Sequence, residues 1–172
     1  MKIYNVIDKD IEYKNSIFLA GPIVRGKEND WHENAYKIFE KMLENPIYKR
    51  FNFDVNLITP KRQIILDDKK LVNQIENEKD AMNKSQLIMF WIPREMNKMI
   101  GMSTQFELGY WYSKNYKKLI VGIPKNAEKV RYIKEFMKND IQFYNTLDET
   151  IQMVLDKMFY IYLAYHFKEF NL

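Results

Sequence analysis

Leu87-Ile-Met-Phe-Trp-Ile92 is a short apolar run that Pro93 closes, and the rest of the chain is organised around it. A run of this length without a polar residue is typical of a strand buried on both faces of a parallel sheet. Residues 95–101 are mostly polar and end in Gly101, so they predict a loop at the carboxyl end of this strand. In open α/β sheets, ligands bind at that edge.

A helix is predicted directly after this loop, and it carries a carboxylate near its start. Ser103 or Thr104 can be its N-cap, because either hydroxyl can accept an unpaired backbone N–H. If Thr104 is the N-cap, Glu107 lies at N3 and completes a capping box. The alternative is chemical: at the mouth of a central strand, Glu107 is a partly desolvated nucleophile or base. Its expected aromatic walls are Phe90, Trp91, Tyr110 and Trp111.

Outward from this segment, apolar strands alternate with helical patterns. Such alternation predicts an α/β fold, a three-layer sandwich around a central parallel sheet of about five strands. We expect a single domain over 1–172, with an N-terminal arm at 1–15 that includes a short strand at 3–7 and a C-terminal helix at 146–170. The other predicted strands are 16–20, 51–59, 87–92, 118–123 and 141–144. The other predicted helices follow Asp30, span 71–84, begin near Thr104 and span 127–138 with Val130, Ile133, Phe136 and Met137 inward.

Composition excludes several classes of function. The 172 residues are 47% apolar and contain no cysteine, so a folded core is expected and thiolate metal sites are excluded. The two histidines, His32 and His166, lack ligand spacing, so we expect neither a metal site nor a Ser-His-Asp triad. A net charge of +4 with interspersed signs argues against a nucleic acid polymer as partner. We expect no membrane partner and a cytoplasmic location, since the chain lacks a long apolar run and a signal peptide.

Several polar or small residues follow the predicted strands. Gly21 and Pro22 end the strand at 16–20 and either let a ligand approach the backbone or only form a turn. The loop at 23–29 could contact a phosphate or a sugar, or be only solvated. Trp31, at the start of the next helix, packs in the core or stacks on a ligand. In the helix at 71–84, a solvated charged face is the default interpretation for each carboxylate, namely Glu76, Glu78 and Asp80.

These motifs, in this order, resemble the nucleoside 2-deoxyribosyltransferase-like family over roughly residues 16–150. The pieces are Phe18-Leu19-Ala20-Gly21-Pro22, Trp31, Thr59-Pro60, Gln74-x-Glu76-x-Glu78, Phe90-Trp91-Ile92-Pro93-Arg94, Thr104-x-x-Glu107-x-Gly109 and Gly122-x-Pro124. No dinucleotide fingerprint, P-loop or nucleophile elbow is present in the sequence.

The resemblance implies a flavodoxin/Rossmann-like sheet and chemistry without a metal or an organic cofactor. It implies that Glu107 attacks C1′ of the sugar and displaces the base, and that Glu78 handles protonation of the base. By the same resemblance, Gly21, Pro22 and Ile23 line the base side, and Ser103 and Thr104 offer hydroxyls to the sugar or to a phosphate. Arg94 forms either an ion pair that stabilises the loop or a ligand contact. The position six residues before Glu107 holds an aspartate in the well-known transferases, and here it is Gly101.

The sequence is therefore compatible with three functions. The first is a transferase that moves a sugar from one base to another. The second is a hydrolase that cleaves the N-glycosidic bond of a nucleoside or nucleotide with water. The third is a non-catalytic nucleotide-binding module. The expected partners are a nucleoside or nucleotide and a free nucleobase, and the aromatic C-terminal helix suggests a homo-oligomer, a dimer or higher.

Overall fold

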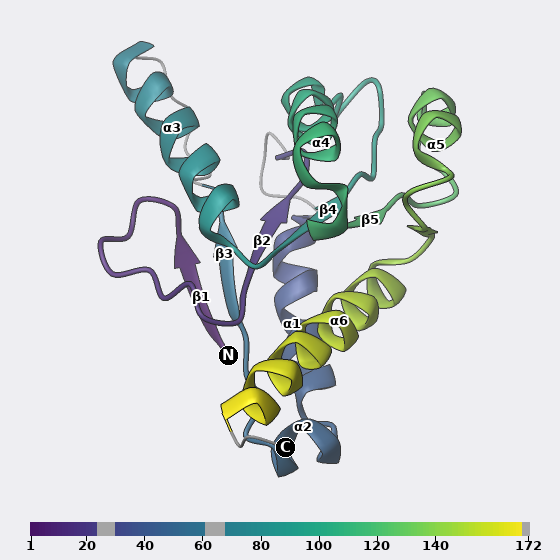
Figure 1. Cartoon of the computed structure of the whole chain (residues 1–172). Helices are drawn as coiled ribbons and strands as arrows, with labels where there is room; N and C mark the ends of the chain where they lie inside the picture. The colour runs from purple at the N-terminus through teal and green to yellow at the C-terminus, as the bar shows by residue number, and fades with distance from the viewer. Residues whose placement is uncertain (24–29, 61–67, 170–172) are drawn as a thin grey trace.

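One parallel sheet of six strands lies at the centre of the computed structural model, which describes residues 1–23, 30–60 and 68–169 (Figure 1). Its order is β1-β3-β2-β4-β5-β6. The strands are β1 (Lys2–Asn5), β2 (Ser16–Ala20), β3 (Asn56–Thr59), β4 (Leu87–Trp91), β5 (Leu119–Gly122) and β6 (Phe143–Tyr144). The helices are α1 (Trp31–Leu43), α2 (Pro46–Arg50), α3 (Asp68–Lys84), α4 (Met102–Asn115), the 3-10 turn η1 (Tyr116–Lys118), α5 (Arg131–Met137) and α6 (Leu147–Glu169). The predicted flavodoxin/Rossmann-like α/β fold is confirmed.

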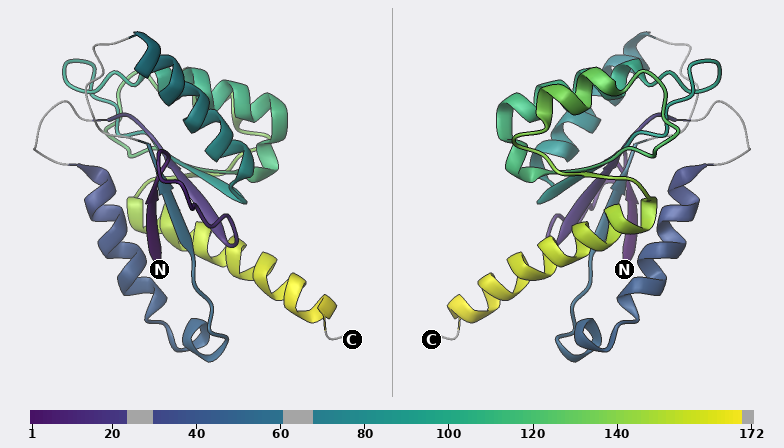
Figure 2. Two further views of the ribbon diagram at one scale, coloured as in Figure 1. Left: turned by 90° about the vertical axis from the view of Figure 1, so that its left-hand side faces the viewer. Right: turned by 90° about the vertical axis from the view of Figure 1, so that its right-hand side faces the viewer.

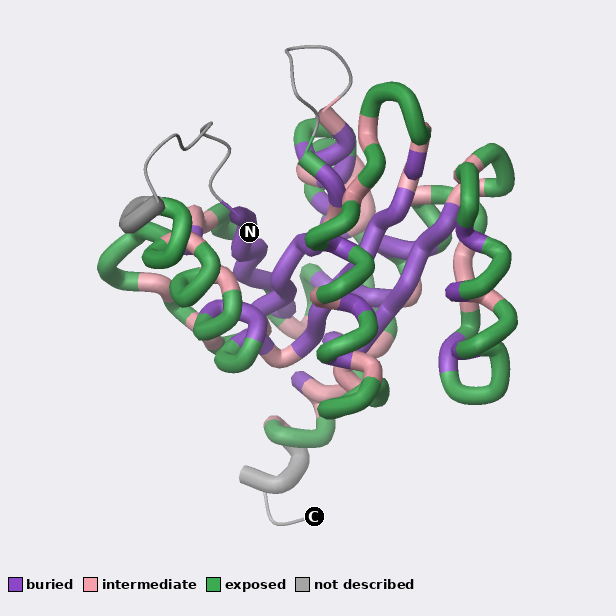
Figure 3. The backbone as a smooth tube through the Cα atoms, turned by 90° about the horizontal axis from the view of Figure 1, so that it is seen from above, coloured by how far each residue is buried: buried purple, intermediate pink, exposed green. Residues whose placement is uncertain are grey.

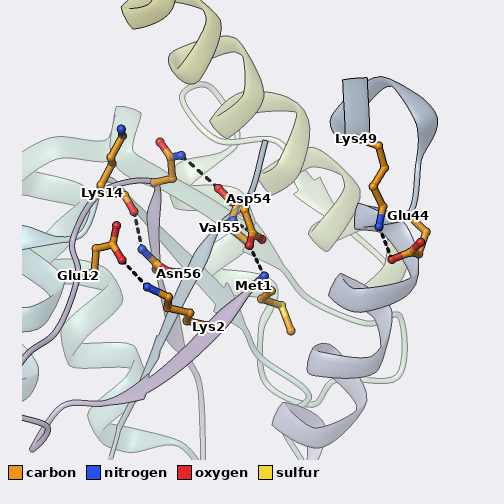
Figure 4. Close-up of polar contacts among 10 residues, drawn as sticks. Met1, Lys2, Glu12, Lys14, Glu44, Lys49, Asp54, Val55 and Asn56 are labelled. Atoms are coloured by element: carbon orange, nitrogen blue, oxygen red, sulfur yellow. Dashed lines mark hydrogen bonds and ion pairs between the residues drawn. The ribbon is translucent and has the colours of Figure 1, made fainter. Parts of the chain in front are cut away.

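The sixth strand lies inside the predicted N-terminal arm. β1 pairs in parallel with β3, with Lys2 opposite Asn56. Side chains tie the rest of the arm to this edge of the sheet (Figure 4): Lys2 forms a 2.9 Å ion pair with Glu12, and Asn56 donates to the Lys14 carbonyl oxygen at 2.9 Å. The short strand predicted at 3–7 is therefore β1, and it adds a sixth strand at the edge of the expected sheet of about five.

Side chains of the central strands alternate between two cores, as the period of two along a strand requires. Figure 2 shows α1 and α6 on one face of the sheet and α3, α4 and α5 on the other. Seen from above, the central strands are buried under both layers (Figure 3). In β4, Met89 and Trp91 face the α1 and α6 core, whereas Ile88 and Phe90 face the α3 to α5 core. The expectation that Trp91 walls Glu107 is wrong, because Glu107 is on α4 and lies across the sheet.

Two helix ends were predicted correctly from capping residues. Asp30 caps α1, since its carboxylate accepts from the His32 backbone N–H at 3.0 Å. Thr146 and Glu149 form a reciprocal capping box at the start of α6, with both bonds at 3.1 Å. α5, in contrast, begins at Arg131 rather than near residue 127.

Phe159 and Tyr162 of α6 pack within the chain, whereas Tyr160 and Tyr165 are exposed. Phe159 packs edge-on against Tyr48, Phe51 and Phe53, and the Tyr162 hydroxyl donates to the Phe51 carbonyl oxygen at 2.8 Å. This packing accounts for only part of the aromatic content from which an oligomer was expected, and the homo-oligomer stays a prediction. In the described ranges, no helix has the length and apolarity that a membrane crossing requires.

Gly122, at the end of β5, is required by close packing. A Cβ atom built on it would collide with the Thr150 hydroxyl and lie 2.5 Å from Cε3 of Trp91. We expect Gly122→Ala to lower the free energy of unfolding by about 1–3 kcal/mol, as other overpacked core substitutions do. Urea unfolding measures the change.

Gly109→Ala is the matched control for this substitution, because a Cβ at Gly109 would meet nothing within 4 Å. Alanine in a helix interior should leave the protein equally stable or stabilise it by about 0.5–1 kcal/mol. Equal destabilisation by both substitutions would contradict the packing described for Gly122.

Candidate active site

The sheet has its topological switch point between β2 and β4. From β2 the chain continues to β3 on one side, and from β4 it continues to β5 on the other. Ligands of open α/β sheets bind at the carboxyl ends of the strands that flank such a point. The predicted site residues Gly21 and Pro22 follow β2 at this edge, and the loop that leads to α4 follows β4.

The turn after β2 is fixed by Trp31. A Cβ on Gly21 would lie 2.5 Å from the Trp91 carbonyl oxygen and 2.7 Å from Cζ2 of Trp31, so only glycine fits between them. The Trp31 indole N–H donates to the Pro22 carbonyl oxygen at 3.1 Å. Trp31 is therefore part of the core and braces the turn, and stacking of its ring on a ligand stays a prediction. Ile23 is exposed beside it, while Arg25 and Lys27 of the predicted contact loop lie outside the described residues.

Gly101 is the N-cap of α4, so the prediction that Ser103 or Thr104 caps this helix is wrong. Gly101 has φ +62° and ψ 46°, a left-handed conformation that favours glycine, and no side chain caps the helix. The chain enters the helix about one turn earlier than a Thr104 cap would allow. Glu107 is therefore not at N3, and the capping-box interpretation of this carboxylate is excluded.

The two hydroxyl-bearing residues in the first turn of α4, Ser103 and Thr104, differ in exposure. Thr104 is buried against the sheet, whereas Ser103 is exposed one turn before Glu107 and on the same side of the helix. The start of α4 also touches the turn after β2, since a Cβ on Gly101 would lie 3.1 Å from Cβ of Pro22. The switch point thus brings together the Gly21–Pro22 turn and the start of α4.

α3 supplies the second predicted carboxylate. The half-buried Glu78 accepts a hydrogen bond of 2.6 Å from the Gln74 side-chain amide, and burial raises the pKa of the Glu78 carboxyl. Its neighbours behave as the default interpretation predicted: Glu76 is exposed, and Asp80 forms a 2.7 Å surface ion pair with Lys84. Burial therefore singles out Glu78, the carboxylate preferred from motif spacing.

The two carboxyl groups interact electrostatically. Burial, and then the negative charge of Glu78, raise the pKa of Glu107 from 4.5 to about 7. No described residue donates a hydrogen bond to the Glu107 carboxyl. A desolvated carboxyl pair at a switch point, with one pKa near neutrality, is suited to nucleophilic or acid–base catalysis.

Arg94 lies on the other flank of α4. Arg94 is only 3% exposed, and its guanidinium donates to the Lys129 carbonyl oxygen at 3.2 Å. With the Gln105 amide turned over so that its oxygen faces the guanidinium, Arg94 also donates to that oxygen at 2.8 and 2.9 Å. Gln105 and Glu107 are two residues apart on a helix, so their side chains point about 200° apart. This geometry supports the interpretation that Arg94 stabilises a loop, through backbone and amide oxygens in place of a carboxylate. Its contact with a ligand stays a prediction.

Sequence reasoning did not assign a role to His32 or to Gln74. His32 is buried, its Nδ1 lies 3.0 Å from an Asp30 carboxylate oxygen, and its ring stacks on Trp31 with centroids 3.8 Å apart. Burial lowers the pKa of His32 to about 4, so the ring is neutral at pH 7. For Gln74, the signal in the sequence was its spacing of four residues from Glu78, which places both on one helix face.

A comparison with protein families finds that the profile described as nucleoside 2-deoxyribosyltransferase-like matches residues 14–127, about two thirds of the chain. The chain belongs to this family. The match contains Gly21, Glu78 and Glu107, and it ends before α5, β6 and α6. A comparison with curated proteins finds no match.

Gly101 stands at the position where the family resemblance leads us to expect an aspartate. An aspartate at this point would need a left-handed conformation with its Cβ pressed on Pro22. The described residues also hold no group of three histidine or acidic side chains arranged for a metal ion.

The raised pKa of Glu107 predicts how stability depends on pH. Because the folded pKa of about 7 exceeds the unfolded value of 4.5, the folded protein binds more protons between these pH values. Wild-type stability should therefore fall as the pH rises from 4.5 to 7. Glu107→Gln should be more stable than wild type by roughly 2–3 kcal/mol at pH 8 and equally stable at pH 4.

Urea unfolding at a series of pH values measures this difference. Glu76→Gln, which changes an exposed carboxylate on α3, is the control and should follow the wild-type curve. A constant difference between Glu107→Gln and wild type at every pH would show that Glu107 has an ordinary pKa.

Proposed function

We propose that this protein is an enzyme that cleaves the N-glycosidic bond of a (deoxy)nucleoside or nucleotide and transfers the sugar to another base. The observation that carries the proposal is the pair of Glu107 and Glu78, a desolvated carboxyl pair beside the switch point with the pKa of Glu107 near 7. Membership of the family supports the substrate class.

The proposed first half-reaction uses both carboxyl groups. An oxygen of the Glu107 carboxylate attacks C1′ of the sugar and forms an ester bond. The C1′–N bond breaks, its electron pair stays on the base, and the protonated Glu78 carboxyl gives that base a proton. The products are a glycosyl ester on Glu107, a neutral free base and an ionised Glu78. This is the two-carboxylate logic of retaining glycosidases.

The second half-reaction reverses these roles. A nitrogen of the incoming base attacks C1′, its proton passes to Glu78, and the ester bond breaks to restore the Glu107 carboxylate. In this proposal Gly21, Pro22, Ile23 and Trp31 border the base, and Ser103 and Thr104 lie on the sugar side. Ser103 is the better placed of the two hydroxyls, because it is exposed on the Glu107 side of α4.

Hydrolysis is the second candidate function, and Gly101 is the observation that favours it. The aspartate that helps with the sugar in the well-known transferases is missing, so the sugar is held with one carboxylate fewer. If water replaces the incoming base, Glu78 removes its proton and the same ester is hydrolysed. A binding module that catalyses nothing has no need of a half-buried carboxylate to which no described residue donates a hydrogen bond, because such an arrangement is costly.

A chromatographic assay with a panel of deoxynucleosides and deoxynucleotides tests the proposal. Each substrate is incubated with and without adenine or cytosine as acceptor, using wild type and Glu107→Ala. Base exchange that requires the acceptor identifies the transferase, and base release at an equal rate without the acceptor identifies the hydrolase. Ligand binding without any turnover would overturn catalysis in favour of the binding module.

A further inference from the structure

The two carboxyl groups of the proposed site have unequal hydrogen bonding. On α3, Gln74 lies one turn before Glu78, and its amide N–H donates to a Glu78 carboxylate oxygen at 2.6 Å. On α4, Glu107 accepts no hydrogen bond from any described residue. A hydrogen bond to a carboxylate favours its ionised form, so the amide stabilises negative charge on one member of the pair alone.

In the described part of the chain, no basic side chain pairs with the Glu107 carboxyl and so replaces the hydrogen bond that it lacks. The basic side chains that the structure describes on α3 from Leu71 onward, on α4 and in the loop after β4 have other contacts. Lys79 and Lys114 lie over the Tyr110 ring, Lys84 pairs with Asp80, Lys98 pairs with Glu95, and Arg94 donates to the Lys129 carbonyl oxygen. On the sheet side, the α3 to α5 core that lies beneath both helices is apolar. The Gln74 amide is therefore the contact that distinguishes the two carboxyl groups.

We propose that Gln74 is a positioning residue that holds the negative charge on Glu78 and thereby leaves the proton of the pair on Glu107 in the ligand-free protein. The nucleophile is then stored as a neutral acid. This inference rests on the proposed function for its catalytic meaning, although the location of the proton is a property of the protein alone.

Attack on C1′ needs an ionised Glu107, and departure of the base needs a proton on Glu78. One proton must therefore leave the Glu107 carboxyl and arrive on the Glu78 carboxyl when substrate binds, with no change in the total charge of the pair. The reactive form is the minor one in the free protein, and Gln74 sets its population.

The location of the proton can be measured without substrate. Carbon-13 NMR of glutamate-labelled protein follows the titration of each side-chain carboxyl, and Glu78→Gln and Glu107→Gln assign the two signals. We expect the wild-type midpoint near pH 7 to belong to Glu107 and to vanish in Glu107→Gln. A midpoint near pH 7 that persists in Glu107→Gln would place the proton on Glu78 and overturn the proposal.

Gln74→Met removes the donor and keeps the length of the side chain. We expect the Glu78 midpoint to rise by about one pH unit, and the acid limb of the kcat/KM profile to move up by the same amount. Asn73→Met, on the exposed side of the same helix, should move neither. An unchanged Glu78 midpoint in Gln74→Met would overturn the role of Gln74. Since the NMR titration needs no turnover, its outcome is separate from failure of the proposed reaction.

Discussion

Replacing Glu107 with glutamine is expected to lower kcat by on the order of 10⁴-fold, with little change in KM. Glutamine keeps the size of the side chain, but its amide cannot form the ester with C1′. The residual rate comes from binding and from the proton that Glu78 still supplies. The measurement is the initial rate of base release under saturating substrate, followed by chromatography.

Glu76→Gln is the matched control for this loss. Glu76 is an exposed carboxylate on α3, two residues from Glu78, and its replacement should leave kcat within about twofold of wild type. If Glu107→Gln kept the rate of the control, Glu107 would not be the nucleophile, and another group would have to attack C1′.

Glu78→Gln is expected to lower kcat by about 10²–10⁴-fold, the usual contribution of a general acid. The loss should depend on the base. A purine nucleoside methylated at N7 already carries a positive charge on its base, so the base leaves as a neutral molecule without a proton from the protein. With such a substrate, the first half-reaction of Glu78→Gln should approach the wild-type rate.

Glu107→Gln should not be rescued by the methylated substrate, because the nucleophile is missing whatever the charge on the base. This crossed pattern separates the two roles within one pair of carboxylates. Equal rescue of both variants would show that Glu107 is not the nucleophile and Glu78 is not the proton donor in the way proposed. Loss of both activities to the same extent with every base would point to a single structural role.

The central fold could be predicted because its strands carry a strong signal. The runs that form β2 and β4 are buried throughout and, apart from Ser16, apolar, and they are followed by Gly21 and Pro93. This pattern is typical of a parallel strand covered on both faces. β1 was expected as a short strand or an arm outside the main sheet, because it is partly exposed and mixes polar with apolar residues. Its partner β3 lies more than fifty residues away, and pairing over that distance leaves no local pattern.

Long-range contacts also explain the wrong helix ends. The backbone N–H of Glu128 donates to the Arg94 carbonyl oxygen at 3.0 Å, and the Arg94 side chain donates to Lys129, which has φ +54°. These contacts hold residues 128–129 outside the helix, so α5 begins at Arg131. Phe136, expected to face inward, is 58% exposed and stacks on Tyr132.

The candidate site was partly predictable, because its residues follow from motif order and from the rule that ligands bind at the carboxyl edge. Glu78 was preferred over Glu76 and Asp80 by spacing, and its burial distinguishes it from both. The left-handed Gly101, the Gln74 hydrogen bond and the shifted pKa of Glu107 depend on how α3 and α4 sit on the sheet. No one-dimensional pattern carries that information.

The most direct test of the central claim is the mass of the protein after reaction with a nucleoside whose sugar carries fluorine at C2′. Fluorine destabilises the positive charge at C1′ and should slow the breakdown of a glycosyl ester enough for mass spectrometry. The account predicts a mass increase equal to the fluorinated sugar, located on the peptide that contains Glu107 and absent from Glu107→Gln. Release of base with no adduct, or an adduct on any other residue, would contradict it.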